Sequence, residues 1–255
     1  MTLFKNALVR KPCRNMVSGL SSAGLGTPDH EKALAQHSAY VCALRYCGLT
    51  VTVLATDETY PDSVFIEDTA VLNERVAVIA RPGVTSRLGE EKAVAAALRS
   101  HYPYLEAIAA PGTLEGGDVF RAGEHFFIGI SGRTNPEGAR QLAMILKKHG
   151  YAVTSIPLRS VLHLKTGVAY LENDRLLACG EFLDHPLLSG FQIVPVDAAE
   201  AYAANSVWIN GRVLVPAGFP QTRKNIEALG YEVVPLDVSE FRKLDGGLSC
   251  LSLRF

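Results

Sequence analysis

The stretch NSVWINGRVLVPAG, residues 205–218, carries the clearest local signal in this chain of 255 residues. Two apolar runs flank the pair Asn210-Gly211. A two-residue hairpin turn of the primed type requires positive φ angles, which asparagine and glycine adopt at little cost. The stretch therefore predicts a β-hairpin that turns at residues 210–211.

The same pattern occurs three more times towards the N-terminus. Each copy has an apolar run, a short polar turn (NER, AGEH or ENDR) and a second apolar run, at residues 67–83, 117–131 and 166–180. A glycine-containing loop, a helical or irregular stretch and a further apolar run follow each hairpin. Helices are expected near residues 29–47, 89–101 and 222–230, and after Asn135, which can cap a helix that Gly150 ends. The stretch after Cys179 is too short and proline-broken for a long helix.

The two chain ends supply the fifth hairpin. CLSLRF at residues 250–255 is typical of a first strand, and FKNALVRKP at residues 4–12 is typical of a second strand. Pairing them would close a ring of five ββαβ-like units with pseudo-fivefold symmetry, as a single α/β domain over residues 1–255. The alternative is an open mixed α/β sheet.

Composition narrows the class of protein. The hydrophobic fraction of 48% is enough for a globular core, and the net charge of -1 argues against a nucleic-acid binder. No apolar run of about 18 residues and no secretion signal is visible, which favours a cytoplasmic protein without a membrane partner. Five cysteines without a CxxC pair indicate neither a disulfide framework nor a zinc site, and Cys42, Cys47 and Cys179 are expected to be structural.

Residues with reactive side chains stand at equivalent places in the repeats. The starts of the expected first strands carry carboxylates, an imidazole, an amide and a thiol, and three of the loops carry arginines: Glu67, Asp68, Glu115, Asp118, His163, Asn205 and Cys250, then Arg87, Arg133 and Arg223. Each has an ordinary explanation, such as a buried structural histidine or a surface arginine. Their coincidence at one end of the ring favours a site.

This set of groups predicts the chemistry of the ligand. A thiolate is a nucleophile, and a histidine can relay protons to and from it. Ionised acids would hold a cation, while arginines grip a carboxylate. A ligand with a cationic end, an anionic end and an electrophilic carbon is similar to arginine.

Long segments resemble one known family, the bacterial dimethylarginine dimethylaminohydrolases of the guanidine-modifying pentein superfamily. The resemblance runs from about residue 5 to Phe255, and it rests on PDSVFIEDTAVL, RPGVTSRLGE, APGTLEGGD, SGRTNPEGARQ, VLHLKTGVAYLE, YAANSVWIN, VPAGFPQTR and FRKLDGGLSCLSLRF. It implies a five-bladed α/β propeller that hydrolyses Nω-methylated arginines to citrulline plus dimethylamine or methylamine. It also implies that neither a metal nor an organic cofactor is needed.

The resemblance also implies residue roles. Cys250 resembles the nucleophile and His163 the general acid/base, with Glu115 as its supporting carboxylate. The remaining matches are to substrate contacts: Glu67 and Asp68 at the guanidinium, Asp62 on the amino-group side, Arg87 and Arg133 at the carboxylate, and Leu20 and Leu244 through backbone contacts on a mobile rim. The Leu20 region, VSGLSSAGLG, reads as a lid. A homodimer is plausible.

Two alternatives stay open at this point. An arginine deiminase-type hydrolase would use the same groups on the unmethylated guanidinium, although agmatine is disfavoured because it has no carboxylate for Arg87 and Arg133. A non-catalytic propeller that binds a macromolecule belongs to another class, and it would not need Cys250, His163 and Glu115 at one end.

Overall fold

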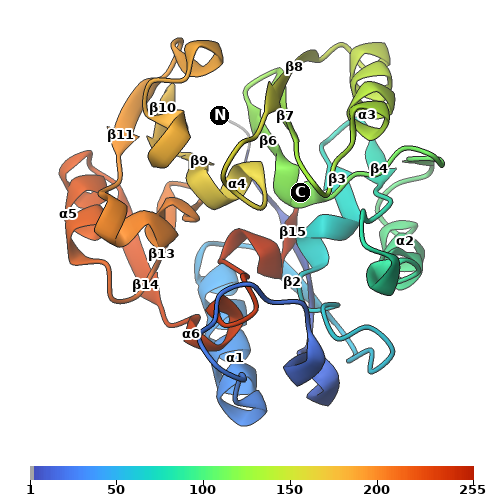
Figure 1. The fold of residues 1–255 in the computed structure, drawn as a ribbon, viewed down its shortest axis with the longest axis horizontal. Coiled ribbons are helices and arrows are strands. Elements are labelled where there is room, and N and C mark those ends of the chain that lie inside the picture. Colours follow the sequence, from blue (N-terminus) through green and yellow to red (C-terminus); the bar gives the residue numbers. More distant parts are fainter. Residues whose placement is uncertain (1–2) are drawn as a thin grey trace.

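The computed structural model describes residues 3–255, which form five three-stranded sheets arranged around a central axis (Figure 1). In each sheet the middle strand pairs antiparallel with one neighbour and parallel with the other. Four of the sheets each consist of three consecutive strands. They are β3 (Ala70–Leu72), β4 (Ala77–Ile79) and β5 (Leu105–Ala107); β6 (Val119–Ala122), β7 (His125–Ile130) and β8 (Ala152–Pro157); β9 (Val168–Tyr170), β10 (Arg175–Ala178) and β11 (Gln192–Pro195); β12 (Val207–Ile209), β13 (Arg212–Pro216) and β14 (Glu232–Leu236). The five ββαβ-like units are confirmed, and the open sheet is excluded.

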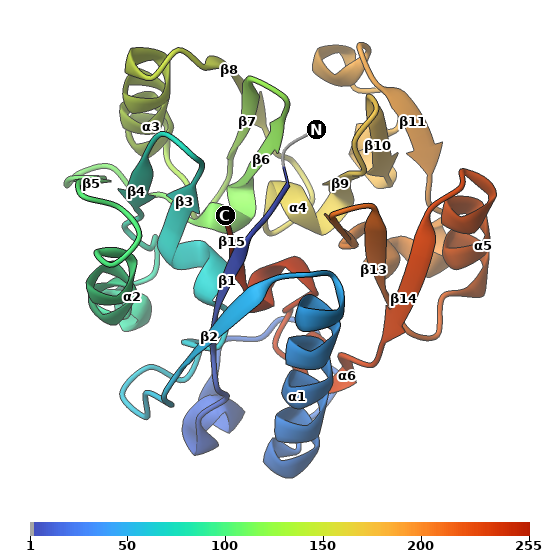
Figure 2. The same cartoon turned by 180° about the vertical axis from the view of Figure 1, so that it is seen from behind.

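The fifth sheet joins the two ends of the chain. It contains β15 (Leu253–Arg254), β1 (Asn6–Arg10) and β2 (Thr50–Leu54), and β1 pairs antiparallel with β15 in the register Leu8 to Leu253. Figure 2 shows β1 and β15 side by side near the middle of the molecule. The predicted closure of the ring is therefore confirmed, but Cys250 does not begin the strand. It lies in a single 3-10 turn, η8 (Ser249–Leu251), because the chain makes one helical turn before it extends.

Four longer helices lie on the outside of the ring: α1 (His30–Tyr46), α2 (Glu91–Leu98), α3 (Pro136–Lys148) and α5 (Pro220–Ala228) (Figure 1). The Asn135 side chain caps α3 by accepting a hydrogen bond from the Gly138 backbone at 2.8 Å. On its inner face α3 buries Leu142 and Leu146 in the same cluster as Phe126. Each buried leucine stabilises the fold by about 1.5–3 kcal/mol. The shorter helices are α4 (Leu164–Gly167) and α6 (Ser239–Arg242).

The hairpin at residues 205–218 turns as expected. Asn210 and Gly211 have φ angles of 50° and 92°, the signs that a type I′ turn requires. The Asn210 amide also donates to the backbone carbonyl oxygens of Phe4 and Cys47, at 2.8 and 3.0 Å. This turn therefore holds the N-terminal segment as well as its own hairpin.

Each unit has one short helical segment that is separated from its first strand by at most two residues. These segments are η2 (Ile66–Thr69), η4 (Gly116–Asp118), α4, η7 (Ala198–Ala204) and η8. The residues expected at strand starts belong to these segments or flank them. A short helical turn aims neighbouring side chains in different directions, whereas an extended strand alternates between two faces.

Two cavities meet at the short helical segments, and the larger one runs from there along the inner strands to the hairpin turns. The larger, of about 710 Å³, is lined by hairpin-turn residues such as Asn73, Gly123 and Glu172, and neither Cys250 nor His163 lines it. The smaller cavity lies at the end where the short helical segments gather, and it is lined by both of these residues. Within residues 3–255, the structure contains no helix with the length and apolar character needed to cross a membrane.

Candidate active site

The smaller cavity brings together eight of the ten predicted site residues. Its lining includes Leu20, Asp62, Asp68, Arg87, Arg133, His163, Leu244 and Cys250. Glu115 lies directly behind His163, and Glu67 faces elsewhere. Four further lining residues escaped the sequence analysis: Phe65, Leu162, Asp245 and Gly246. Each is one to four residues from a predicted site residue, so adjacency to the motifs was the available signal.

Cys250 is half-buried on the η8 turn, and the Gly247 backbone N–H donates to its Sγ at 3.4 Å. The turn is anchored one residue earlier, where the backbone N–H of Ser249 donates to Asn205 Oδ1 at 2.9 Å. Burial, with the nearby charges of Glu67 and Asp68, raises the pKa of the Cys250 thiol to about 12. In the free protein the group is therefore a thiol at neutral pH, and a cation beside it would favour the thiolate.

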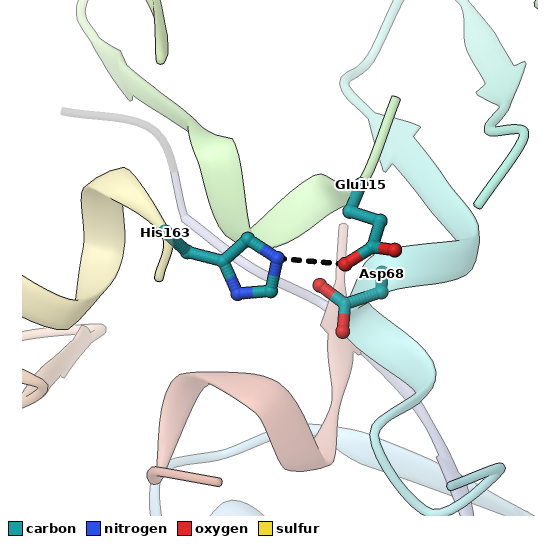
Figure 3. Close-up of side chains that lie close together, drawn as sticks. All are labelled: Asp68, Glu115 and His163. Carbon is teal, nitrogen blue, oxygen red and sulfur yellow. Dashed lines mark hydrogen bonds and ion pairs between the residues drawn. The ribbon is translucent and has the colours of Figure 1, made fainter. Parts of the chain in front are cut away.

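His163 and Glu115 form the central pair of the site. His163 Nε2 lies 2.7 Å from Glu115 Oε2 (Figure 3), and Glu115 is fully buried. Burial disfavours the imidazolium, but the charge of Asp68 and the hydrogen bond to Glu115 outweigh it and raise the pKa of His163 to about 9. The imidazole is therefore protonated at neutral pH, which prepares it to donate a proton.

Asp68 lies beside this pair (Figure 3). Its carboxylate accepts from Arg87 Nη1 at 2.7 Å and from the Gly117 backbone at 3.0 Å. Burial opposes ionisation, yet the attraction of His163 and Arg87 lowers the pKa of Asp68 to about 2. A Cβ atom at Gly117 would lie 2.8 Å from the His163 ring and 2.9 Å from Asp68 Oδ1, so only glycine leaves room for this contact.

The two arginines expected to grip a carboxylate differ in their surroundings. Arg87 is 3% exposed, and its guanidinium lies 2.7 Å from Asp68, 2.5 Å from Glu90 and 3.2 Å from the Phe65 carbonyl oxygen. Arg133 is half-buried and contacts Glu115 at 3.3 Å through Nη1 alone. More of the Arg133 guanidinium is free to meet a ligand.

The structure places Glu67 behind the site rather than in it. Its carboxylate binds Lys165 Nζ at 2.5 Å, Arg254 Nη2 at 3.0 Å and Ser249 Oγ at 2.7 Å, and it lines the larger cavity. The expected direct contact between Glu67 and a guanidinium in the smaller cavity is therefore not formed by this geometry. Its charge acts on Cys250 through the turn that separates the two cavities.

Asp62 and the Leu20 segment form the rim. Asp62 is buried, which raises the pKa of its carboxyl, and it accepts the Leu20 backbone N–H at 3.0 Å. Leu20 itself is exposed. The following serines contact the segment that precedes the thiol, since Ser21 Oγ donates to the Lys243 carbonyl oxygen at 2.6 Å. The expected lid thus lies across the same edge as Leu244.

Asp68, Glu115 and His163 also offer one possible metal-ligand atom each, and these atoms lie within 4.8 Å of one another. Arg87 and Arg133 already contact two of the three groups. Both carboxylates are therefore already paired with guanidinium groups, and a divalent ion at this place would lie next to their positive charge.

A ring of five α/β units with a thiol, an imidazole–carboxylate pair and arginines at one end of its axis is the architecture of the guanidine-modifying enzymes. A family model described as "N,N dimethylarginine dimethylhydrolase, eukaryotic" matches residues 27–186. A dimethylarginine dimethylaminohydrolase of Pseudomonas aeruginosa is 51% identical over 254 residues, which cover 99% of this chain and 100% of the relative. The chain belongs to the dimethylarginine dimethylaminohydrolase family.

Solved structures agree with this assignment. The P. aeruginosa enzyme with a cysteine replaced by serine, in complex with citrulline, superimposes with a TM-score of 0.98 at 50% identity and covers 100% of both chains. A dimethylarginine dimethylaminohydrolase with a histidine replaced by glycine, as an adduct with S-methyl-L-thiocitrulline, gives 0.98 at 50% identity and covers 99% of this chain and 100% of the other. The five-bladed propeller expected from the sequence is therefore the fold of this family.

Proposed function

We propose that this protein hydrolyses Nω-methylated arginines to citrulline and dimethylamine or methylamine, with Cys250 as nucleophile and His163 as general acid and base. The observation that carries the proposal is the smaller cavity, where the thiol of Cys250 and the imidazole of His163 face the same small space as Asp68, Asp62 and the two arginines, with Glu115 bound to the imidazole from behind. The citrulline complex of the P. aeruginosa relative supports citrulline as the product.

Binding would begin with the charges of the substrate. The guanidinium is placed next to Asp68 and Cys250, and the α-carboxylate meets Arg133, with Arg87 fixed beside it. Asp62 and the Leu20 segment contact the α-amino end. The cationic guanidinium offsets the burial and the acidic neighbours that hold the Cys250 proton in place, so the thiol releases its proton on binding.

The first chemical step forms a carbon–sulfur bond. The Cys250 thiolate attacks the guanidinium carbon, the C–N bond to the methylated nitrogen breaks, and the His163 imidazolium protonates the departing amine. Dimethylamine leaves, and a cationic S-alkylthiouronium stays on Cys250. Glu115 holds the imidazole in position while its charge changes.

The second step restores the thiolate. His163, now neutral, takes one proton from a water molecule whose oxygen attacks the same carbon. The carbon–sulfur bond breaks, the second water proton is released as the carbonyl forms, and citrulline leaves. Once citrulline has left, the Cys250 thiolate takes back from solvent the proton that it gave up on substrate binding, and the site residues return to their starting protonation states without any redox change.

The test is citrulline release from asymmetric dimethylarginine, monomethylarginine and arginine, measured side by side. Cys250→Ser is the loss-of-function variant, and Cys42→Ser is its matched control because Cys42 is exposed and remote from the cavity. We expect release from the methylated substrates, abolished only in Cys250→Ser. Release mainly from arginine would assign a deiminase, and no release from any substrate would favour a binding module.

Three properties complete the proposal. The whole chain acts as one catalytic domain, it forms a homodimer, and it works in the cytoplasm. Light scattering coupled to size-exclusion chromatography checks the second property, and a monomer at micromolar concentration would contradict it.

A further inference from the structure

One buried carboxylate beside the site has no part in the mechanism above. Asp118 on η4 is fully buried. Its Oδ1 accepts the backbone N–H of Leu164 at 3.0 Å, and its Oδ2 accepts the hydroxyl hydrogen of Ser131 at 2.7 Å. Leu164 directly follows His163, so Asp118 fixes the point at which the chain turns from His163 into α4.

Ser131 extends this contact to a second site residue. Its Oγ accepts the backbone N–H groups of Arg133 at 2.9 Å and Thr134 at 3.1 Å. A hydroxyl has two lone pairs and one hydrogen, so with both lone pairs engaged its hydrogen is available only to Asp118. Burial raises the pKa of Asp118, whereas the charge of His163 and the hydrogen bonds that Asp118 accepts on both oxygens favour the ionised carboxylate.

Thr134 connects the same hydrogen-bond network to Glu115. Its Oγ1 accepts the Glu115 backbone N–H at 3.1 Å, and Thr134 is fully buried. The three segments that carry Glu115, Arg133 and His163 are thus joined through a single carboxylate and two hydroxyl groups.

A glycine in the neighbouring strand leaves room for the Asp118 carboxylate. Gly129 lies inside β7, where glycine weakens a strand. A Cβ atom at this position would lie 2.9 Å from Asp118 Oδ1 and 3.0 Å from Leu164 Cβ. The glycine is explained by the close approach of Asp118 and the segment it holds.

We propose that Asp118 is a positioning residue of the hydrolysis, which holds His163 and the Arg133 turn in register and adds a fixed negative charge beside the imidazolium. The proposal rests on the roles proposed above for His163, Glu115 and Arg133. Asp118 touches neither the thiol nor the cavity, so it acts only through these residues.

The charges around His163 determine the direction of the expected effect. Asp68, Glu115 and Asp118 favour the imidazolium, and burial opposes it. Of the cations nearby, Arg87 is paired with Asp68 and Arg133 with Glu115. Lys165 on α4 is paired with Glu67. Cys250 lines the same cavity as His163. Removing the charge of Asp118 therefore lowers the pKa of His163.

Two variants separate the charge from the tether. Asp118→Asn keeps an oxygen for the Leu164 N–H but removes the charge, while Ser131→Ala keeps the charge and cuts the link to the Arg133 turn. Glu200→Gln is the control, because Glu200 likewise accepts backbone N–H groups, those of Gln221 and Thr222, in a different unit of the ring. The readouts are the NMR titration of the His163 ring, assigned with His163→Gln, and kcat and KM for asymmetric dimethylarginine.

We expect Asp118→Asn to move the His163 titration to lower pH and to reduce kcat by roughly 10- to 100-fold, the cost of a misplaced catalytic group. Ser131→Ala should leave the titration in place and raise KM. An unchanged titration in a folded Asp118→Asn, or unchanged kcat and KM in Ser131→Ala, would overturn the proposal. If Asp118→Asn does not fold by circular dichroism, Ser131→Ala decides. The titration is independent of turnover, so it still tests Asp118 if methylarginines prove not to be substrates.

Discussion

His163 keeps its proton at neutral pH because three carboxylates face it inside the fold. The pKa of about 9 means that the imidazolium is present below that pH and is lost as the pH rises through it. The amine can leave only when it is protonated, so the acid form of His163 is the active one in the first step.

This gives a prediction for the pH dependence of the reaction. We expect kcat for asymmetric dimethylarginine to fall as the pH rises through about 9, because His163 loses the proton that the amine needs. Glu115→Gln removes the negative charge of the carboxylate that faces the imidazolium, so its residual activity should fall at lower pH than that of the native protein. The measurement is initial citrulline release between pH 6 and 11. A native profile that still rises at pH 10 would contradict this role of His163.

The reactivity of the thiol should depend on the charge of the reagent. Burial and the acids that raise the pKa of Cys250 to about 12 make it a poor nucleophile towards a neutral reagent. Iodoacetamide at pH 7 should therefore modify exposed Cys42 before Cys250. An alkylating agent that carries an amidinium group should reverse this order, which peptide mass spectrometry would show. If both reagents modify Cys42 before Cys250, the result would argue against thiolate formation assisted by the bound cation.

The freer of the two arginines should control recognition of the carboxylate. Replacing Arg133 by alanine removes a charge-assisted hydrogen bond of about 1.5–3 kcal/mol, so we expect KM to rise by roughly 10- to 100-fold. The variant should also lose the preference for dimethylarginine over its decarboxylated analogue. Arg140→Ala is the control, because Arg140 is exposed on α3 and pairs only with residues of its own helix. If Arg133→Ala keeps the preference for dimethylarginine, the result would indicate that Arg87 and not Arg133 binds the carboxylate.

At the scale of the element, the short helical segments before the first strands lie between the two cavities described above. Glu67 and Ser249 line the larger cavity, whereas their neighbours Asp68 and Cys250 line the smaller one. Adjacent residues therefore serve different surroundings. These segments pack closely against their neighbours, so there is little room in them for added side-chain volume.

Gly117 is the position where this lack of room can be tested. A methyl group there would press on the His163 ring and on Asp68, so Gly117→Ala should lower kcat by about 100-fold and destabilise the fold by about 1–3 kcal/mol. Gly190→Ala is the matched control, because a Cβ at Gly190 meets nothing within 4 Å. Kinetics and urea unfolding of both variants are the measurements. Full activity in Gly117→Ala would show that His163 moves freely.

At the scale of the whole molecule, the closure of the ring is linked to the site. Leu253 on β15 is 4% exposed and packs in one cluster with Leu8 of β1 and Ile66 of η2, the turn that carries Asp68. The strand that closes the ring thus also supports the turns beside the cavity.

Leu253→Ala should therefore reduce both stability and activity. We expect a loss of about 2–4 kcal/mol in the free energy of unfolding, as for other buried leucines, and a lower kcat because η8 and η2 lose a common support. Leu187→Ala is the control, since Leu187 is 46% exposed. Chemical denaturation and citrulline release check the two effects. A destabilised but fully active Leu253→Ala would show that closure and site are independent.

The sequence was sufficient for features that depend on local structure and on repetition. The Asn210-Gly211 turn and the Asn135 cap follow from the preferences of neighbouring residues, and the repeated hairpins predicted the ring and its closure by the two ends of the chain. The same repetition predicted that Cys250, His163 and Glu115 would meet, because equivalent positions of a closed ring face one axis. The roles of the individual site residues rest on the resemblance to the family.

Other features depend on contacts between segments far apart in the chain, and the sequence pattern did not contain them. Glu67 and Asp68 look equivalent in the sequence, but packing turns one towards Arg254 and the other towards His163. The ion pairs of Arg87, the tether from Asp118 to Leu164 and the raised pKa values of His163 and Cys250 arise in the same way. Electrostatic energy depends on burial and on distance through space, and both quantities exist only once the ring has closed.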